Sequence, residues 1–461
     1  MLYPESSSPC LDPDLFRHPN AHYRGIPFWS WNCRITRELI DEQLPLFQRM
    51  GFGGVVIHSR SGLDTVYLGS EYMDLVRYAI NRCGQLGLLC WLYDDDRFPS
   101  GAAGGLVTRD PKFRQRFLLL TEHPRPDCMP DQFSFDEAIQ RGEIPAGWYA
   151  ASYAIGKNTF RRLTASDPAR SGETVRYAYV MLLETEDWFQ GQTYVDIMHP
   201  SAVRRFINLT HEAYLKEVGS SFGNTVTAIF TDEPRMETRT RLHPKHLKSA
   251  DDRSDVILPW SEPLRNRLLK DYQTDLLDIA PLLLWDLPGS FHARYIFRNA
   301  AGEQFVTAFM DQIAAWCNQH HLFLTGHVLS EDTLYAQATA LGDCMRCYRG
   351  MDIPGIDILC DDRQFLTVKQ AASVAHQMGR EGVASELYGV TEWNCTFKTF
   401  KLQGDWQDEH GRRGQARLAR IHLFSISLLD RIFFHRRLLC QAEHCANPWI
   451  PDDRCGCAPS G

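Results

Sequence analysis

The stretch LCWLYDDDRFPSGAAGG, from Leu89 to Gly105, changes character abruptly in its middle. An apolar run is followed by three consecutive aspartates, Asp94, Asp95 and Asp96, and then by a segment rich in glycine. The apolar run is typical of a buried strand, whereas acidic side chains require water or a polar partner. We therefore predict that a strand ends directly before the aspartates and opens there onto a polar cleft.

The chain before this stretch repeats the same arrangement twice. The apolar segments IPFWSW (residues 26–31) and GGVVIHSRSG (residues 53–62) each precede an amphipathic stretch typical of a helix. Thr36 is suited to cap the first helix and Gly87 to end the second. Apolar strands that alternate with helices favour parallel pairing through right-handed crossovers, with polar residues gathered at the carboxyl ends of the strands.

Five further apolar segments continue this alternation. They are VTAIFTDEPR (226–235), HLFLTGHVLSED (321–332), GIDILCDDR (355–363), GVASELYGVTEWN (382–394) and IHLFSISLLD (421–430). The pattern predicts an α/β fold of the (β/α)8 TIM-barrel type, with a doubly wound sheet as the alternative. No GxGxxG motif follows the first strand, so we expect no nucleotide cofactor.

Changes in composition divide the chain into three parts. Residues 1–24 form an N-terminal segment, and residues 25–407 form the barrel with an insertion at about 109–191. Residues 408–461 are atypical, with many arginines and four cysteines near the end. The eighth strand falls in this last part, so we expect a barrel that is incompletely closed at its C-terminal end.

Composition excludes several classes of partner. The 461 residues carry a formal net charge of −8, which argues against nucleic acid as the main partner. No apolar run is long enough to cross a membrane, and no signal peptide precedes the first strand, so we expect a cytoplasmic protein. The 14 cysteines lack a paired spacing and are expected to be reduced thiols. Oligomeric state is not indicated by any of these features.

Carboxylates recur at or just after the predicted strand ends. They are Asp94, Asp95, Asp96, Asp232, Glu233, Glu331, Asp361, Asp362, Glu386 and Glu392. A single acid at such a place is usually a turn residue or a helix cap. Several acids at one barrel mouth would instead repel one another, so that some stay protonated near neutral pH while others ionise. Glycoside hydrolysis, whose substrate is a sugar, requires one protonated and one ionised carboxyl.

Glu233 and Glu386 are the strongest catalytic candidates among these acids. Glu233 precedes Pro234, which cannot donate to a strand ladder and therefore favours a turn. Glu386 lies inside an apolar strand, so it must point into the mouth or be held in a buried ion pair.

Basic and aromatic side chains flank the acids. His58, Arg60 and His327 lie at strand ends, where they would orient sugar hydroxyls or serve as structural residues. Trp29, Trp31 and Trp393 are candidates for contacts with a sugar ring, with packing inside the barrel as the alternative for each.

Seven motifs together resemble the catalytic barrel of glycoside hydrolase family 106, which includes α-L-rhamnosidases. They are PFWSWN, GFGGVVIHSRSGL, WLYDDDRFPSGAAGG, FTDEPR, GHVLSE, SELYGVTEWN and KLQGDWQ. The resemblance extends from about Gly25 to Gln407 and implies an inverting, calcium-assisted hydrolysis of a terminal α-L-rhamnoside-like sugar. It maps catalytic glutamates onto Glu233, Glu331 and Glu386.

Within that resemblance, Glu233 is assigned as the acid and Glu386 as the base, and Glu331 helps to hold the substrate or calcium. Members of the family continue into β-rich domains after the barrel, whereas no such continuation follows Gln407 here. A catalytically inactive or sugar-binding relative of the same barrel is therefore the alternative to an active glycosidase.

Overall fold

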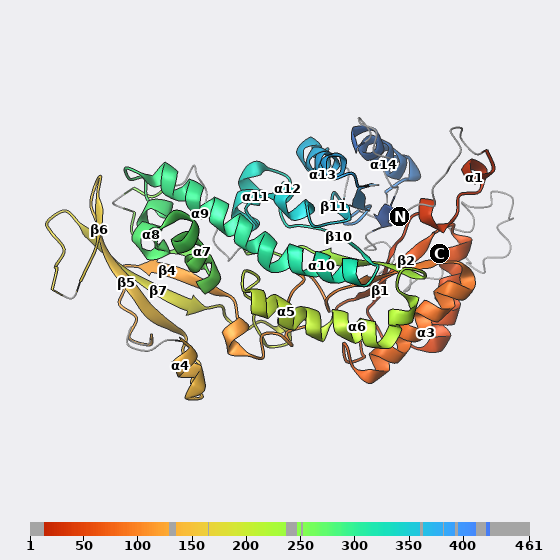
Figure 1. Cartoon of the computed structure of the whole chain (residues 1–461), viewed down its shortest axis with the longest axis horizontal. Helices are drawn as coiled ribbons and strands as arrows, with labels where there is room; N and C mark the ends of the chain where they lie inside the picture. The colour runs from red at the N-terminus through yellow and green to blue at the C-terminus, as the bar shows by residue number, and fades with distance from the viewer. Residues whose placement is uncertain are drawn as a thin grey trace, which may run out of the picture.

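The main element of the fold is a parallel sheet that forms an open barrel (Figure 1). The computed structural model describes residues 13–128, 135–164, 166–236, 247–249, 252–359, 363–380, 382–391, 395–411 and 421–424. Among them, the sheet has the order β1-β2-β3-β8-β10-β11-β12-β13. The strands are β1 (Phe28–Trp31), β2 (Gly54–Ser59), β3 (Leu89–Tyr93), β8 (Val226–Asp232), β10 (Phe323–His327), β11 (Ile353–Asp357), β12 (Ala384–Leu387) and β13 (Ile421–Phe424).

The barrel is not closed. Seven parallel strands form a partial barrel whose edges lie 9 Å apart, and β13 pairs with β12 beyond them. Hydrogen-bonded neighbours in a sheet are about 4.8 Å apart, so the two edges of the seven-stranded part do not pair with each other. The prediction of an α/β, TIM-like barrel that is incompletely closed is confirmed.

Helices pack on the outside of this sheet. They are α2 (Arg37–Arg49), α3 (Ser70–Leu86), α5 (Pro200–Leu209), α6 (His211–Val218), α9 (Ser290–Phe305), α10 (Asp311–Gln319), α11 (Leu334–Ala340), α12 (Cys344–Tyr348), α13 (Phe365–Gln377) and α14 (Phe397–Gly411). The predicted helix ends are confirmed, because Thr36 accepts the Leu39 N–H at 3.2 Å and Gly87 ends α3 with φ 67°. Helix α2 buries Ile40, Leu44 and Phe47, and each such side chain contributes about 1.5–3 kcal/mol.

A second, antiparallel sheet projects from the barrel at the left of Figure 1. Its order is β6-β5-β7-β4-β9, with bounds β4 (Arg116–Thr121), β5 (Gly147–Ile155), β6 (Phe160–Arg162), β7 (Thr174–Leu182) and β9 (Val256–Trp260). Four of these strands come from the predicted insertion, but β9 follows β8 in the chain. The fifth strand was not expected, because no strand is predicted between residues 235 and 321.

Four further α-helices lie in the described chain, besides short 3-10 helices and a π-helix at Val306–Met310. They are α1 (Pro13–Arg17), α4 (Phe135–Gln140), α7 (Glu262–Tyr272) and α8 (Leu276–Leu284). One continuous core includes side chains from both sheets, among them Val55 of β2 and Val180 of β7. No helix in the described ranges has the length and apolar character needed to cross a membrane.

Candidate active site

The strand register brings acidic and basic side chains into one row at the carboxyl end of the barrel. Pairing of β8 with β10 places Asp232 beside His327, and pairing of β11 with β12 places Asp357 beside Glu386. Strands β10 and β11 are themselves neighbours, so the two pairs are adjacent. We call the following six residues the carboxyl cluster: Asp232, Glu233, His327, Glu331, Asp357 and Glu386.

His327 is at the centre of the carboxyl cluster and is only 2% exposed. Its Nε2 lies 2.9 Å from Asp232 Oδ1 and 3.9 Å from Asp357 Oδ2, and its Nδ1 lies 3.7 Å from Glu386 Oε2. Burial opposes a charged imidazole, but the surrounding carboxylates outweigh it and raise the pKa of His327 well above its usual value. The ring therefore carries a positive charge at neutral pH.

Asp232 is the most strongly anchored carboxylate of the cluster. In addition to His327, it accepts a hydrogen bond of 2.6 Å from the Tyr93 hydroxyl, and its own N–H donates to Ser100 Oγ at 2.9 Å. Although burial favours the neutral acid, the positive His327 lowers the pKa of Asp232 below its usual value. The electrostatics of the cluster therefore favour an ionised Asp232.

Glu233 has the opposite protonation behaviour. Burial, followed by the negative charge of Asp232, raises the pKa of Glu233 to about 7. Its backbone adopts φ 45°, a left-handed conformation that costs a non-glycine residue about 1–3 kcal/mol, and its N–H donates to the His327 carbonyl at 3.2 Å. The turn holds a carboxyl that is still partly protonated at neutral pH next to one that is ionised.

Glu331 and Asp357 form a second linked pair. The Asp357 N–H donates to Glu331 Oε1 at 2.8 Å, and burial raises the pKa of both carboxyls. Asp357 was not among the predicted site residues, which in this segment were Asp361 and Asp362. An aspartate inside the apolar segment GIDILC satisfies the same argument that identified Glu386. For Glu386 itself, the contact with His327 makes it both mouth-facing and ion-paired.

The three consecutive aspartates do not act as a group. Asp95 is buried, and its two carboxylate oxygens accept N–H groups from Asp96, Gly101, Ala102, Ala103 and Gly104 at 2.7–2.9 Å. Asp94 accepts the Ser100 hydroxyl. Asp96 binds the Arg97 guanidinium at 3.0 Å and the Gln190 amide at 3.2 Å. These contacts fold the loop after β3, and Ser100 links that loop to Asp232.

Two of the tryptophans named as candidates for contacts with a sugar lie in the core. Trp29 and Trp31 are 1% and 0% exposed, and their rings meet edge to face at 5.5 Å within the core. The Trp29 Nε1 donates to Gln43 Oε1 of α2 at 2.7 Å, which places that side chain on the helix-covered face of β1. The two tryptophans therefore follow the packing alternative. Trp393, together with Asp361, Asp362 and Glu392, lies outside the described residues.

His58 and Arg60 lie at the end of β2. The His58 ring is buried and stacks on Tyr93 at 3.9 Å, and burial lowers its pKa well below the usual value. This histidine is neutral at physiological pH, unlike His327. Arg60 is half-buried, and its N–H donates to the Trp31 carbonyl at 3.1 Å. Of the two residues, His58 adjoins the cluster through Tyr93, which binds Asp232.

The carboxyl cluster offers one set of candidate metal ligands among the described residues. Glu233, His327 and Asp357 each present a ligand atom, and these atoms lie within 4.8 Å of one another. Calcium takes six to eight oxygen ligands, whereas this set supplies two carboxylates and an imidazole whose two nitrogens already face carboxylates. Glu331, the predicted calcium ligand, is not in the set. The donor set fits calcium poorly.

Comparison with known proteins finds a solved structure with a similar fold. No protein-family model and no curated protein matches the chain by sequence. The structure is similar to that of a rhamnosidase from Novosphingobium sp. PP1Y, with a TM-score of 0.61 and 14% identity over 89% of this chain and 56% of that protein. An isomaltulose synthase from Klebsiella sp. LX3 aligns with a TM-score of only 0.31 at 9% identity, over 84% of this chain and 55% of that one.

The first of these similarities shows that the chain shares the barrel fold of that rhamnosidase. The chain spans little more than half the length of the solved proteins it matches. At these identities the likeness concerns the fold, and a barrel hosts many chemistries, so the reaction has to be argued from the carboxyl cluster itself.

Proposed function

We propose that the chain is a glycoside hydrolase that cleaves terminal α-L-rhamnoside-like sugars with inversion. The observation that carries this proposal is the division of protonation within the carboxyl cluster. The pKa of Glu233 is raised to about 7, while the pKa of the adjacent Asp232 is lowered. Glycoside hydrolysis requires one carboxyl that stays protonated and another that stays ionised. Similarity of the barrel to a rhamnosidase supports the class of substrate.

In the proposed reaction, Glu233 gives its proton to the glycosidic oxygen as the bond from that oxygen to the sugar carbon breaks. Glu386 takes a proton from a water molecule, whose oxygen bonds to the same carbon from the opposite face. Exchange with solvent then returns a proton to Glu233 and removes one from Glu386. His327, in contact with Glu386 and Asp232, offsets the negative charge that collects in the cluster.

The spacing of carboxyls argues against Asp357 as the base of an inverting enzyme. Inversion leaves room for a water between two carboxyls about 6.5–9.5 Å apart, whereas retaining enzymes place them about 5–5.5 Å apart. An oxygen of Asp357 lies within 4.8 Å of one of Glu233, which is too close for the inverting arrangement. If Asp357 were the partner of Glu233, the reaction would proceed with retention.

The test is hydrolysis of p-nitrophenyl α-L-rhamnoside, followed by proton NMR of the first sugar anomer released. We expect turnover with release of the inverted β-anomer. Release of the α-anomer would show retention, and would make Asp357 rather than Glu386 the partner of Glu233. A folded protein with no turnover on this substrate or on a panel of other glycosides would support an inactive or sugar-binding relative instead.

Calcium assistance is a separate proposal, implied by the family resemblance and tested in the same assay. The poor fit of the described donor set leads us to derive no step through the metal. Turnover that is lost after chelation and restored by calcium would support it, whereas equal rates with and without chelator would remove calcium from the proposal.

A further inference from the structure

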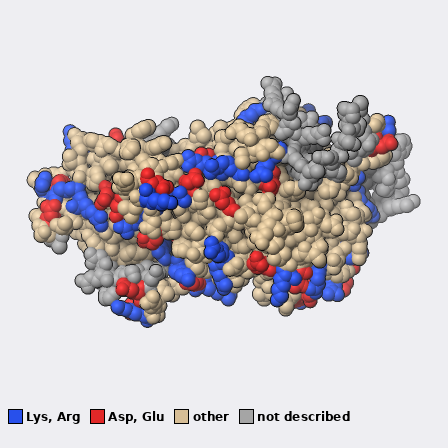
Figure 2. Space-filling model, in the orientation of Figure 1, with Lys and Arg blue, Asp and Glu red and all other residues tan. Residues whose placement is uncertain are grey.

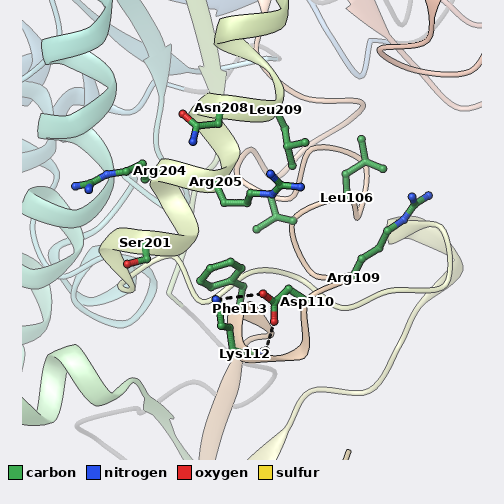
Figure 3. A pocket seen from close by; sticks show the side chains of 11 residues that line it. Leu106, Arg109, Asp110, Lys112, Phe113, Ser201, Arg204, Arg205, Asn208 and Leu209 are labelled. Atoms are coloured by element: carbon green, nitrogen blue, oxygen red, sulfur yellow. Dashed lines mark hydrogen bonds and ion pairs between the residues drawn. The ribbon is translucent and has the colours of Figure 1, made fainter. Parts of the chain in front are cut away.

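A second concave site shares no residue with the carboxyl cluster. It lies between the exposed face of α5 and the segment from Leu106 to Phe113, and its volume is ≈ 530 Å³ (Figure 3). That volume is within the range of about 300–1,000 Å³ that is typical of ligand pockets. The segment directly follows the loop that Asp95 fixes through backbone N–H groups, so one wall of the pocket is held in place by that loop.

The helix presents a polar face to this pocket. Ser201, Arg204, Arg205 and Asn208 are spaced at i, i+3, i+4 and i+7, which places them on one side of α5, and all four are exposed. The opposite side of the helix is buried through Ala202, Val203, Phe206 and Ile207. Core packing therefore fixes the direction in which the two arginines project.

The charge of the pocket is unbalanced. Its lining includes four cations, Arg109, Lys112, Arg204 and Arg205, against one acid, Asp110. Lys112 Nζ lies 3.3 Å from the Asp110 carboxylate, which neutralises that pair. In the described part of the chain, the three arginines have no ion pair and no side-chain hydrogen bond, and they leave a local charge of about +3 on a protein whose net charge is −8.

Several other arginines in the described part of the chain are paired with acids. Arg34 lies 2.6 Å from Glu71, and Arg265 lies 2.7 Å from Asp275. Uncompensated guanidinium groups repel one another and are suited to bind carboxylate, sulfate or phosphate groups through paired N–H donors. Figure 2 shows Lys and Arg side chains over α5, below the middle of the view.

The orientation of the three guanidinium groups indicates the shape of the ligand. In Figure 3, Arg204, Arg205 and Arg109 point apart rather than toward one point, with Arg205 between the other two. A compact anion such as free phosphate contacts convergent donors. Separated donors instead match charges that recur along an extended chain.

We propose that this pocket binds an extended acidic glycan through its repeated carboxylate or sulfate groups. The glycan part of this inference rests on the proposed glycosidase function, whereas the anionic part rests on Arg109, Arg204 and Arg205 alone. Nucleic acid is the other extended polyanion, but the pocket offers only Phe113 as an aromatic ring, and that ring is buried and lies under Lys112. Single-stranded nucleic acid is usually bound with bases stacked on exposed aromatic rings.

The test is isothermal titration calorimetry of the full chain with a hexa-uronate, a neutral hexasaccharide, inorganic phosphate and a single-stranded DNA oligonucleotide. We expect the hexa-uronate to bind and the neutral sugar and phosphate not to bind. The triple variant R109A/R204A/R205A should weaken hexa-uronate binding at least tenfold. A charge-matched control, R17A/R34A/K401A, removes three exposed cations that are already paired and should leave binding unchanged.

Each outcome decides between defined alternatives. Equal binding by the triple variant and the control would overturn the site, and tight binding of phosphate or DNA would overturn the acidic glycan as its ligand. The triple variant should keep the wild-type rate on p-nitrophenyl α-L-rhamnoside, because none of its residues is in the carboxyl cluster. Hexa-uronate binding without turnover on any glycoside would refute the proposed hydrolase while leaving the anion site in place.

Discussion

The carboxyl cluster and the Asp94–Asp96 loop begin from the same feature, acidic residues at the carboxyl end of a barrel strand. In the cluster, the acids face one another and the charged His327, and the pKa values of Asp232 and Glu233 shift in opposite directions. In the loop, burial also raises the pKa of Asp95 to about 7, but five backbone N–H groups of its own segment occupy both of its oxygens. The donors that surround an acid, rather than its place after a strand, separate a reactive carboxyl from a structural one.

The largest effect is expected from Glu233→Gln, which removes the proposed acid while preserving side-chain volume. We expect kcat to fall by about 10²–10⁴-fold, the usual contribution of general acid catalysis. The urea midpoint should change little, because the neutral amide replaces a carboxyl that is already partly protonated. Steady-state kinetics and urea unfolding on the same preparation measure both, with the exposed Glu71→Gln as the control. A variant that keeps its wild-type kcat would remove Glu233 from the mechanism.

Asp95→Asn should show the reverse pattern, a loss of stability with little change in kcat. The amide presents one acceptor oxygen to five N–H donors, so several buried donors lose their partner at about 1–3 kcal/mol each. We expect the free energy of unfolding to fall by about 2–4 kcal/mol, measured by urea unfolding. The exposed Asp127→Asn is the matched control, since Asp127 forms its ion pair at the surface, with Arg125 two residues before it. Unchanged stability with a lost rate would show that Asp95 belongs with the reactive acids.

The pH dependence of kcat/KM tests whether the reaction needs one protonated and one ionised carboxyl. A general acid is active only when protonated, so kcat/KM should fall as pH rises through about 7, the pKa of Glu233, by tenfold per pH unit above it. The base must be ionised, which produces a second, acidic limb. Glu233→Gln should abolish the alkaline limb in whatever activity remains. An alkaline limb that survives in this variant would belong to another group.

The sequence predicts the strand ends well, but it does not predict which acids meet. Alternation of apolar strands and capped helices is local, so the barrel, Thr36 and Gly87 follow from it. Convergence of Asp232 with His327 and of Asp357 with Glu386 depends on register between strands that lie far apart in the chain. The sequence also does not predict which face of β1 is directed toward the helices. Side chains alternate along a strand, so Trp29 and Trp31 lie on one face, and only the contact with Gln43 shows that this face is toward α2.

The smallest effect is expected from Tyr93→Phe, which removes one hydroxyl between the two regions. Tyr93 donates to Asp232 at 2.6 Å from the last residue of β3, so it links the strand before the aspartate loop to the carboxyl cluster. Loss of this bond should cost about 1 kcal/mol and reduce the preference of Asp232 for its ionised form. Asp232 should still be ionised near pH 7 after this loss, because its pKa starts below the usual value, so its charge beside Glu233 is preserved. The alkaline limb of kcat/KM should therefore stay where it is in the wild type. A shift of that limb to lower pH would show instead that the Tyr93 hydroxyl controls the charge of Asp232, and a matched shift in Ser100→Ala, which removes the hydroxyl that accepts the Asp232 N–H, would extend this control to the loop itself.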